Sequence, residues 1–382
     1  MNLRRSTNGE ATEMAAAVAS SSADPVVLDE QSFHRMIAVE RRRTERSHKP
    51  FLLVLLDTGT STPSRRNGKD LGKILSVLLE TTRETDVAGW YKDNSVIGLM
   101  FTGIAMEERN AIVSTMLTRI SAALSTQLSL EQFNEISISF YLFPEDWHQE
   151  IPRKANTKVL YPDLDKRDQA RKSLSILKRT MDIVGSLMVL ILASPVFAIV
   201  ALAIKLTSRG PIFFKQQRVG QYGVPFSLLK FRSMYADSDC STHKEYVLQL
   251  IAGVAERKPS NGNGQGVYKL TSDSRVTAVG AFLRRTSLDE VPQFINVLRG
   301  EMSLVGPRPP IDYEVESYDL WHRRRLMEAK PGITGLWQVN GRNRIAFDDM
   351  VRLDLMYAKS WSPWLDVRIL ARTPRAVVEG AH

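Results

Sequence analysis

An uninterrupted run of 22 uncharged residues, from Ile183 to Ile204, constrains the fold of this chain more than any other feature. As a straight α-helix the run would be about 33 Å long, and the hydrocarbon core of a bilayer is about 30 Å thick. A helix in a soluble domain normally keeps a polar face, which this run lacks. The sequence therefore predicts that residues 183–206 enter a membrane.

Two features of the run predict that it enters the membrane and returns to the same side. Ser194 and Pro195 lie near its middle, and proline removes a backbone donor and clashes with the preceding turn, so we expect a sharp kink there. Basic flanks remain on the cytoplasmic side of a membrane, and a hairpin in one leaflet satisfies two such flanks. A kinked helix that spans the bilayer is the alternative, since membrane helices tolerate proline. The basic residues are Lys166, Arg167, Arg171, Lys172, Lys178 and Arg179 before the run and Lys205, Arg209, Lys215 and Arg218 after it.

The excess positive charge of the chain lies after residue 170. Residues 1–170 carry 21 Lys and Arg against 23 Asp and Glu, whereas residues 171–382 carry 30 against 19. Such a surface suits anionic lipid, phosphorylated substrates or nucleic acid, and charge alone does not choose among them.

Length, cysteine and histidine content narrow the class of protein further. A chain of 382 residues is expected to form two domains. One cysteine, Cys240, excludes an internal disulfide and fits a reducing cytosol. The six histidines have no metal-ligand spacing, so a zinc site is not expected.

The chain before the apolar run is divided into a leader, a domain and a linker. Residues 1–29 are small and polar and predict a disordered leader without a signal peptide. Residues 30–146 alternate apolar and amphipathic segments in the order β-α-β-β-α-β, which predicts a ferredoxin-like α+β domain. Residues 147–176 are charged and contain proline, and are interpreted as a linker or an exposed helix. The expected segments are strands at 51–58 and 136–143, helices at 70–83 and 107–125, and a hairpin turning at 92–94.

The stretch RETDVAGWYKDNSVIGLMF resembles the GGDEF domain family of diguanylate cyclases. The positions of the family's signature pentad hold Lys92 to Val96, so the glycine pair that admits nucleotide and the acids that bind metal are absent. The resemblance implies a degenerate, catalytically inactive relative over residues 30–146. A generic α+β domain without a nucleotide partner is the alternative.

Adjacent acids, Asp289 and Glu290, stand in an arginine- and proline-rich stretch after the apolar run. Cleavage of a pyrophosphate by attack at phosphorus needs an anionic nucleophile and positive charge on the phosphate oxygens. One carboxylate can be that nucleophile, and its neighbour can bind Mg²⁺. The alternative is a capping box, in which Ser287 and Glu290 satisfy free amides at a helix start; Pro292 weakens it, because proline would fall beyond the first turn.

Basic residues near the acids are candidate phosphate ligands. Arg284 and Arg285 precede the pair, and Arg308 stands between two prolines, where its planar fork suits bidentate contact with phosphate. Two strands over 213–234, around a turn at Gly220–Gly223, are expected to bring Arg218, Lys230 and Arg232 close together. Lys230 and Arg232 would then bind phosphate, or else lie on a solvated strand face or contact lipid headgroups.

Four motifs in order, QQRVGQYGVPFSLLKFRSM, LTSDSRVTAVGAFLRRTSLDEVPQ, MSLVGPRP and KPGITGLWQVNGRN, resemble the bacterial sugar transferases over about residues 176–376. These are monotopic phosphoglycosyl transferases, which move a sugar phosphate from a UDP-sugar to polyprenyl (undecaprenyl) phosphate and release UMP, the initiating step of exopolysaccharide or glycoconjugate synthesis. The resemblance implies a mixed α/β domain over 177–382 with a re-entrant hairpin. It also implies that Asp289 forms a covalent phosphosugar intermediate, that Glu290 binds Mg²⁺ and that Arg308 contacts the donor.

The resemblance implies a place in the cell and a set of partners. The protein would be monotopic in the bacterial inner membrane, with its catalytic domain facing the cytoplasm. Its partners would be a UDP-sugar, polyprenyl phosphate and inner-membrane lipid, without nucleic acid; a homodimer through residues 30–146 is left open. Trp361 and Trp364 would lie in the headgroup region or pack into the core. The rivals are direct transfer with both substrates bound, and a membrane-anchored nucleotide-sensing or scaffold protein without transferase activity.

Overall fold

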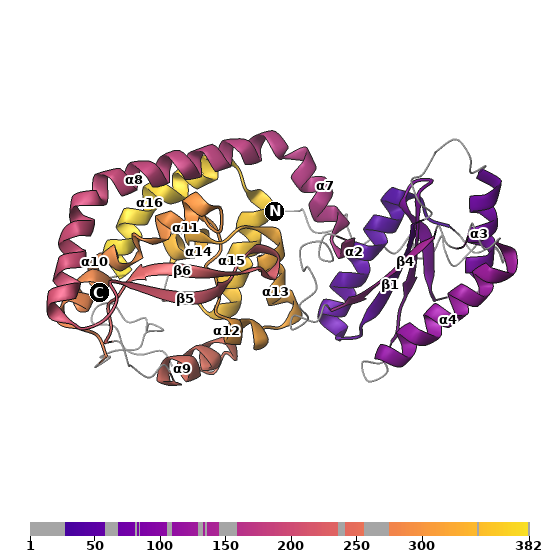
Figure 1. Ribbon diagram of the computed structural model, residues 1–382, viewed down its shortest axis with the longest axis horizontal. Coiled ribbons are helices and arrows are strands. Elements are labelled where there is room, and N and C mark those ends of the chain that lie inside the picture. Colours follow the sequence, from indigo (N-terminus) through magenta and orange to yellow (C-terminus); the bar gives the residue numbers. More distant parts are fainter. Residues whose placement is uncertain are drawn as a thin grey trace, which may run out of the picture. The chain divides into compact units, whose positions relative to one another are not determined.

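The computed structural model divides the chain into two compact units, which are described separately (Figure 1). Unit 1 holds the described residues up to 144 together with 159–163, and unit 2 holds those from 164 onward. Of the predicted leader, residues 1–26 lie outside the described part of the chain. The structure describes residues 27–57, 68–80, 82–83, 85–104, 109–128, 133, 136–144, 159–235, 241–255, 275–341 and 344–380.

Unit 1 contains an antiparallel four-stranded sheet in the order β2-β3-β1-β4. The predicted element order β-α-β-β-α-β is observed, preceded by a helix, α2, that the sequence did not predict. The elements are α2 (Glu30–Ser47), β1 (Phe51–Asp57), α3 (Gly68–Glu80), β2 (Val87–Lys92), β3 (Val96–Phe101), α4 (Arg109–Gln127) and β4 (Ser137–Phe143).

The sheet of unit 1 is buried against helices because β1 is apolar at almost every position. Alternate β1 residues Leu52, Val54 and Leu56 pack in one cluster with residues of α3 and α4. Two glycines of the sheet, Gly89 and Gly98, leave room for the ring of Phe33 from α2, since a Cβ at either would collide with it. The hairpin between β2 and β3 turns where predicted, at a residue with positive φ, Asn94.

Unit 2 is a mixed α/β unit with two small sheets, one antiparallel pair (β5 and β6) and one parallel pair (β7 and β8). The predicted strand pair around Gly220–Gly223 is confirmed. After α7 (Pro162–Ala170), whose first residues belong to unit 1, the elements are α8 (Lys172–Thr207), β5 (Phe213–Val219), η2 (Gln221–Gly223), β6 (Pro225–Phe231), α9 (Ser241–Ile251), α10 (Ala278–Thr286), η3 (Leu288–Glu290), α11 (Gln293–Arg299), β7 (Ser303–Val305), α12 (Asp312–Glu316), α13 (Leu320–Glu328), β8 (Gly332–Thr334), α14 (Leu336–Asn340), α15 (Phe347–Ser360) and α16 (Pro363–Gly380).

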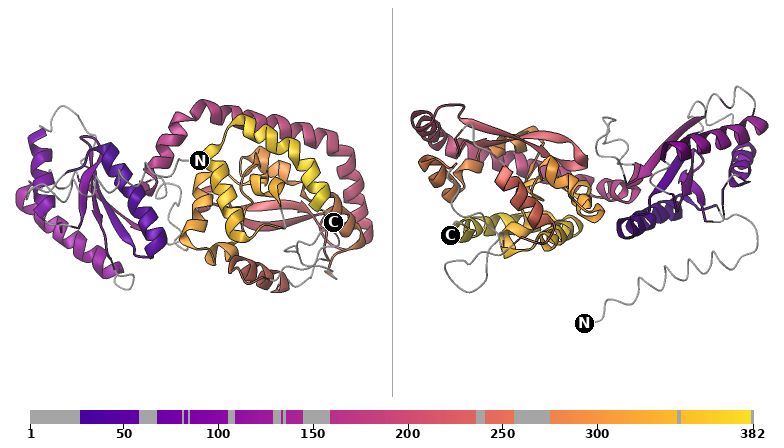
Figure 2. Two further views of the ribbon diagram at one scale, coloured as in Figure 1. Left: turned by 180° about the vertical axis from the view of Figure 1, so that it is seen from behind. Right: turned by 90° about the horizontal axis from the view of Figure 1, so that it is seen from below.

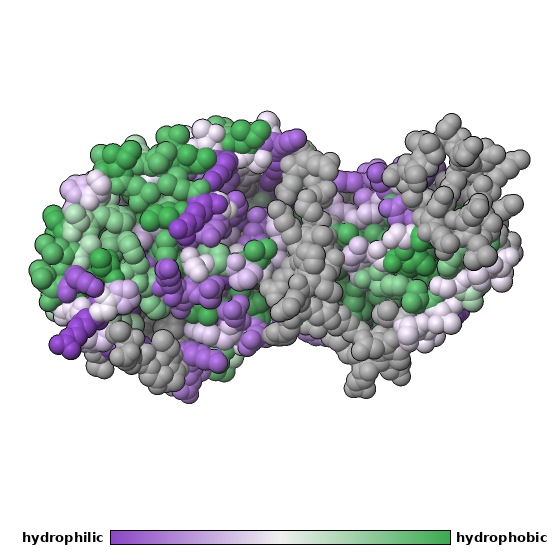
Figure 3. Space-filling model, in the orientation of Figure 1, coloured by the Kyte–Doolittle hydropathy of each residue, from purple (hydrophilic) through white to green (hydrophobic). Residues whose placement is uncertain are grey.

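The apolar run forms most of α8, a single helix of 36 residues with Pro195 inside it. The helix borders unit 2 and bends along its course (Figures 1 and 2). It is long and apolar enough to cross a membrane. Only 11% of its most apolar stretch is buried inside the protein, so this stretch forms a hydrophobic surface (Figure 3). The helix continues through Ser194 and Pro195 without a loop. The kink predicted at these two residues and the return to the same side of the membrane stay predictions. Exposed apolar residues include Val184, Leu187, Met188, Ile191, Leu192, Ile199 and Leu202.

Polar residues in the first half of α8 attach it to the elements that carry the candidate site. Arg179 donates to the carbonyls of Val297 and Leu298 at the end of α11, at 2.6 and 2.7 Å. Asp182 is buried and accepts from the hydroxyl of Ser303 and the amide of Leu304, both at 2.9 Å. Because carbonyls at a helix end and a strand amide are satisfied in this way, α8 fixes α11 and β7 in place.

Candidate active site

The adjacent acids lie in the tight connection between α10 and α11. Thr277 caps the start of α10 by accepting from the amide of Gly280, and a Cβ at Gly280 would collide with the carbonyl of Ser233. The helix ends at Ser287, which has a left-handed conformation with φ 56°. Asp289 follows in η3, a single 3₁₀ turn. The backbone thus reverses locally and places the acids beside β6.

The capping-box alternative is wrong, because the side chain of Ser287 makes no capping hydrogen bond at the start of η3. Ser287 instead terminates α10 through its backbone amide, and a left-handed residue at that position is a common helix end. Glu290 turns toward Lys230, whose Nζ lies 3.1 Å from its Oε1.

Asp289 is the more buried of the two acids, with 8% of its surface exposed. Burial raises its pKa to about 6, and the negative charge of Glu290 adds to this effect. The positive charges of Lys230 and Arg284 oppose it. Asp289 is therefore mostly ionised at neutral pH, while it is poorly solvated by water.

Two cations near Asp289 are held by other groups. Lys230 pairs with Glu290, and Arg284 donates from Nε to the hydroxyl of Ser233 at 2.9 Å. Both charges lower the pKa of Asp289 through space. Among the described residues, neither cation forms a direct ion pair with Asp289.

Arg308 lies within range of the same charges. Its Nη1 is 3.2 and 3.3 Å from the two oxygens of Glu314, which is 1% exposed, and its carbonyl accepts from Arg325. About a third of the Arg308 side chain is exposed. Glu314 raises the pKa of Arg308 most, and Glu290 contributes to the same effect. Arg308 thus interacts electrostatically with Glu290, although 18 residues separate the two along the chain.

The expected cluster of Arg218, Lys230 and Arg232 does not form. In the register of the strand pair Arg218 faces Phe226, whereas Lys230 faces Phe214 near the opposite end. Arg218 is buried, donates to the carbonyl of Pro309 at 2.8 Å and has its pKa lowered to about 10, mainly by burial. The turn at Gly220–Gly223 already sets this register, with Arg218 next to the turn and Lys230 far from it, so the expected cluster was wrong on local grounds.

Arg232 and Arg285 are the two remaining candidate phosphate ligands. Arg232 is buried and donates to the carbonyl and hydroxyl of Ser208, at the end of α8, at 2.8 and 2.7 Å. Two other nitrogens of Arg232, Nε and Nη1, have no hydrogen-bond partner among the described residues. Arg285 is exposed on α10. Contact of either side chain with phosphate stays a prediction.

A cavity of about 150 Å³ borders Glu290. Its walls are mainly apolar and come from α11, β8, α14 and α16, with hydroxyl and amide groups among them. Thr334 and Thr373 form a hydroxyl pair at 2.9 Å across two of these elements. The cavity therefore gives a reactant access to Glu290 from one side. Its lining residues are Ser287, Glu290, Val291, Phe294, Ile333, Thr334, Gln338, Thr373, Ala376 and Val377.

The donor set at the acids fits Mg²⁺ only when phosphate completes it. Within the described ranges, no group of three His, Cys, Asp or Glu side chains could hold a metal ion by itself. Magnesium is commonly bound by one or two carboxylates together with water and substrate phosphates. Asp289 and Glu290 supply such carboxylates, so Mg²⁺ binding there would depend on a phosphorylated ligand.

The functional candidates that the sequence did not indicate are buried charges with distant partners. Glu314 neutralises Arg308, and Arg325, which is fully buried, pairs with Asp354 at 3.2 Å. Glu314 and Arg325 lie in short helices without a recognisable motif, so only the packing identifies them.

Comparison with known proteins identifies the family of this chain. The family model described as bacterial sugar transferase matches residues 173–380, more than half of the chain, and the chain belongs to this family. An undecaprenyl-phosphate galactose phosphotransferase of Salmonella typhimurium is 45% identical over 216 residues, which cover 56% of this chain and 43% of that protein. The exopolysaccharide production protein ExoY of Sinorhizobium fredii is 39% identical over 202 residues, covering 53% of this chain and 85% of that protein. The chain thus spans less than half the length of the first of these relatives.

A solved structure of a DGC protein from Thermotoga maritima matches 32% of this chain and 85% of its own, with 24% identity and a TM-score of 0.26. The GGDEF-like character of residues 30–146 stays a prediction.

Proposed function

We propose that this protein transfers a sugar phosphate from a UDP-sugar to polyprenyl (undecaprenyl) phosphate and releases UMP. The observation that carries the proposal is a buried carboxylate, Asp289, beside a second acid, Glu290, and within the field of Lys230 and Arg284. Arg308 interacts electrostatically with Glu290. Membership of the sugar transferase family and the name of the Salmonella typhimurium relative support the same reaction.

Asp289 is proposed as the nucleophile. A carboxylate oxygen attacks the β-phosphorus of the donor, and the bond from this phosphorus to the bridging oxygen breaks, so that UMP leaves with the electron pair. The sugar phosphate is then held as an acyl phosphate on Asp289. An oxygen of the lipid phosphate attacks the same phosphorus, and the carboxylate is released. Burial supports this role, because a poorly solvated carboxylate is a better nucleophile.

The cations around Asp289 are proposed to hold the phosphate groups. Lys230 and Arg284 lie on the β6 and α10 sides of the acid, and Arg308, on the loop after β7, interacts electrostatically with Glu290. Positive groups placed before the reaction stabilise charge as it develops on the phosphate oxygens. Glu290, with the phosphates, is proposed to hold Mg²⁺, which when bound would withdraw charge from those oxygens.

The membrane position is proposed from α8. Its exposed apolar surface fits immersion in lipid, and the acceptor is itself a membrane lipid. A re-entrant α8 in the bacterial inner membrane would keep both basic flanks and the acids on the cytoplasmic side, where UDP-sugars are made. The product would then begin an exopolysaccharide or another glycoconjugate.

The test is UMP release from a panel of UDP-sugars by the full chain in detergent, with polyprenyl phosphate and Mg²⁺. When the acceptor is omitted, a UDP-sugar with a radiolabelled sugar should leave its labelled sugar phosphate attached to the protein. Asp289→Asn should not become labelled. Turnover without a trapped label would support direct transfer between the two bound substrates. Failure of every UDP-sugar to release UMP would instead support a membrane-anchored sensor or scaffold.

A further inference from the structure

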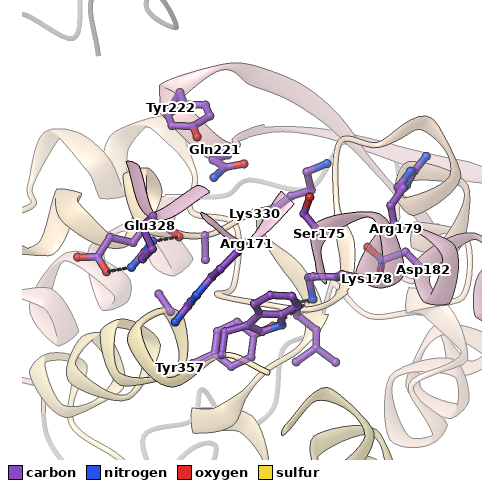
Figure 4. Close-up of a pocket in the computed structure, with 15 residues that line it drawn as sticks. Arg171, Ser175, Lys178, Arg179, Asp182, Gln221, Tyr222, Glu328, Lys330 and Tyr357 are labelled. Carbon is purple, nitrogen blue, oxygen red and sulfur yellow. Dashed lines mark hydrogen bonds and ion pairs between the residues drawn. The ribbon is translucent and has the colours of Figure 1, made fainter. Parts of the chain in front are cut away.

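A second cavity, of about 290 Å³, opens elsewhere in unit 2 (Figure 4). Among the described residues, none lines both this cavity and the one beside Glu290. Its walls come from the end of α7 and the first turns of α8, from η2, and from the ends of α13 and α15. It therefore lies at the polar end of the helix whose apolar part begins at Ile183.

The cavity is lined by more positive than negative charge, and both of its acids are engaged. Glu328 pairs with Arg167 at 3.3 Å and with Arg324 at 2.6 Å. Asp182 accepts from the hydroxyl of Ser303 and the amide of Leu304 of β7. The basic lining residues are Arg167, Arg171, Lys178, Arg179 and Lys330.

Two of these cations are held by carbonyls rather than carboxylates. Arg171 donates to the carbonyl of Lys359 at 3.2 Å, and Arg179 donates to two carbonyls of α11. A carbonyl orients a guanidinium but does not neutralise it, so the positive charge of the cavity is not compensated by these contacts. Figure 4 shows Arg171 across the middle of the cavity, with Lys178 and Tyr357 beside it. Lys178, by contrast, has an acid partner in Asp366 at 2.7 Å.

Aromatic residues form two further parts of the wall. Trp361 is fixed by a hydrogen bond from its Nε1 to Asp366 at 3.0 Å. Tyr222 stands in η2 with φ 59° and ψ 24°, a left-handed conformation that costs about 1–2 kcal/mol for a residue with a Cβ. Such conformations persist where the surroundings enforce them, often at ligand sites.

We infer that this cavity binds the phosphate group of a second ligand, separately from the donor at Asp289. A guanidinium offers two parallel donors to phosphate oxygens, and Arg171 is held in place with its charge uncompensated. The phosphate could come from a membrane lipid, because the cavity adjoins the start of the apolar run, or from a soluble compound such as a nucleotide, which Tyr222 could cover. The inference does not depend on the proposed transferase reaction.

The test is a binding measurement on the full chain at low salt. Inorganic phosphate and UMP, the soluble probes, are added to the protein in detergent. For the lipid probe the protein is placed in nanodiscs that contain phosphatidylglycerol and compared with the protein in nanodiscs of phosphatidylcholine alone. The signal is the part of the tryptophan fluorescence change that Trp361→Phe removes, since Trp361 lines this cavity. Arg171→Gln should weaken the binding that gives this signal about tenfold or more, and Arg171→Lys should restore part of it.

Lys172→Gln is the matched control, because Lys172 is exposed, adjacent in α8 and outside the described lining of the cavity. It should leave the affinity unchanged. Binding of phosphatidylglycerol alone would identify a lipid as the source of the phosphate, and binding of the soluble probes alone would identify a soluble ligand. Equal affinities of Arg171→Gln and Lys172→Gln, or no Trp361-dependent signal with any probe, would overturn the inference. UMP release measured on the same variants reports separately on Asp289.

Discussion

Two buried carboxylates of unit 2, Asp289 and Asp354, differ in whether a cation pairs with them directly. Burial raises the pKa of both, to about 6 for Asp289 and to about 7 for Asp354. Asp354 has a direct partner, since Arg325 lies 3.2 Å away and is fully buried with it. The cations nearest to Asp289 instead bond to Glu290 and Ser233. One acid stabilises the packing of α13 on α15, whereas the other is left available to a substrate at some cost in stability.

Replacement of Asp289 should have the largest effect on activity. Asp289→Asn removes the proposed nucleophile, so UMP release should fall by at least about 10³-fold. The exposed acid Asp349 serves as a control, and Asp349→Asn should release UMP at the normal rate. Full turnover by Asp289→Asn would exclude the covalent mechanism.

Replacement of Asp354 should have the largest effect on stability. Asp354→Leu removes the oxygen that accepts from Nη1 of the buried Arg325, and a buried donor left without an acceptor costs about 1–3 kcal/mol, more when it is charged. Unfolding by denaturant in detergent measures this loss. Asp349→Asn breaks an exposed pair with Arg352 and should change stability by less than about 1 kcal/mol. Equal losses in the two variants would contradict the structural role given to Asp354.

Asp289→Asn should raise the free energy of unfolding of the protein, by an amount that depends on pH. Because the pKa of Asp289 rises from 3.8 to about 6 on folding, the folded protein keeps a proton that the unfolded chain releases between about pH 4 and 6. The stability of the unsubstituted protein therefore falls as pH rises through this window, and the loss is complete above about pH 6. In EDTA, Asp289→Asn should be more stable by up to about 3 kcal/mol at pH 7 and by almost nothing at pH 4.

The difference between the two proteins at each pH is the quantity to follow, because every other titrating group is common to both. A constant difference from pH 4 to pH 7 would show that burial does not penalise the charge of Asp289.

Loss of the cation beside the acids should have the smallest effect. Lys230→Gln removes a positive charge that lowers the pKa of Asp289, and it removes the ion pair between Lys230 and Glu290. The rate of UMP release at neutral pH should fall roughly tenfold. Lys215→Gln, an exposed change on the paired strand, should leave the rate unaltered. Equal rates for the two variants would remove Lys230 from the site.

The sequence was sufficient wherever a feature depends on neighbours along the chain. Short apolar runs predicted the strands of unit 1, the uncharged run predicted α8, and the glycine-bearing turn predicted the β5–β6 pair. The motifs around Asp289 and Arg308 predicted the family, which the family model confirms. Helix α2 was missed, because its charged residues, among them Arg42 and Arg43, obscure the apolar face that includes Phe33 and Ile37.

Only the tertiary structure decided which charges meet. The spacing of Ser287 and Glu290 also fits a capping box, and no motif indicates which group Arg218 contacts. Packing placed Ser287 in a left-handed turn and Arg218 against the carbonyl of Pro309. The pairing of Glu314 with Arg308 and of Arg325 with Asp354 likewise arose where helices met. Local propensities act within a few residues, whereas a buried charge is fixed by whichever distant partner offsets the cost of removing it from water.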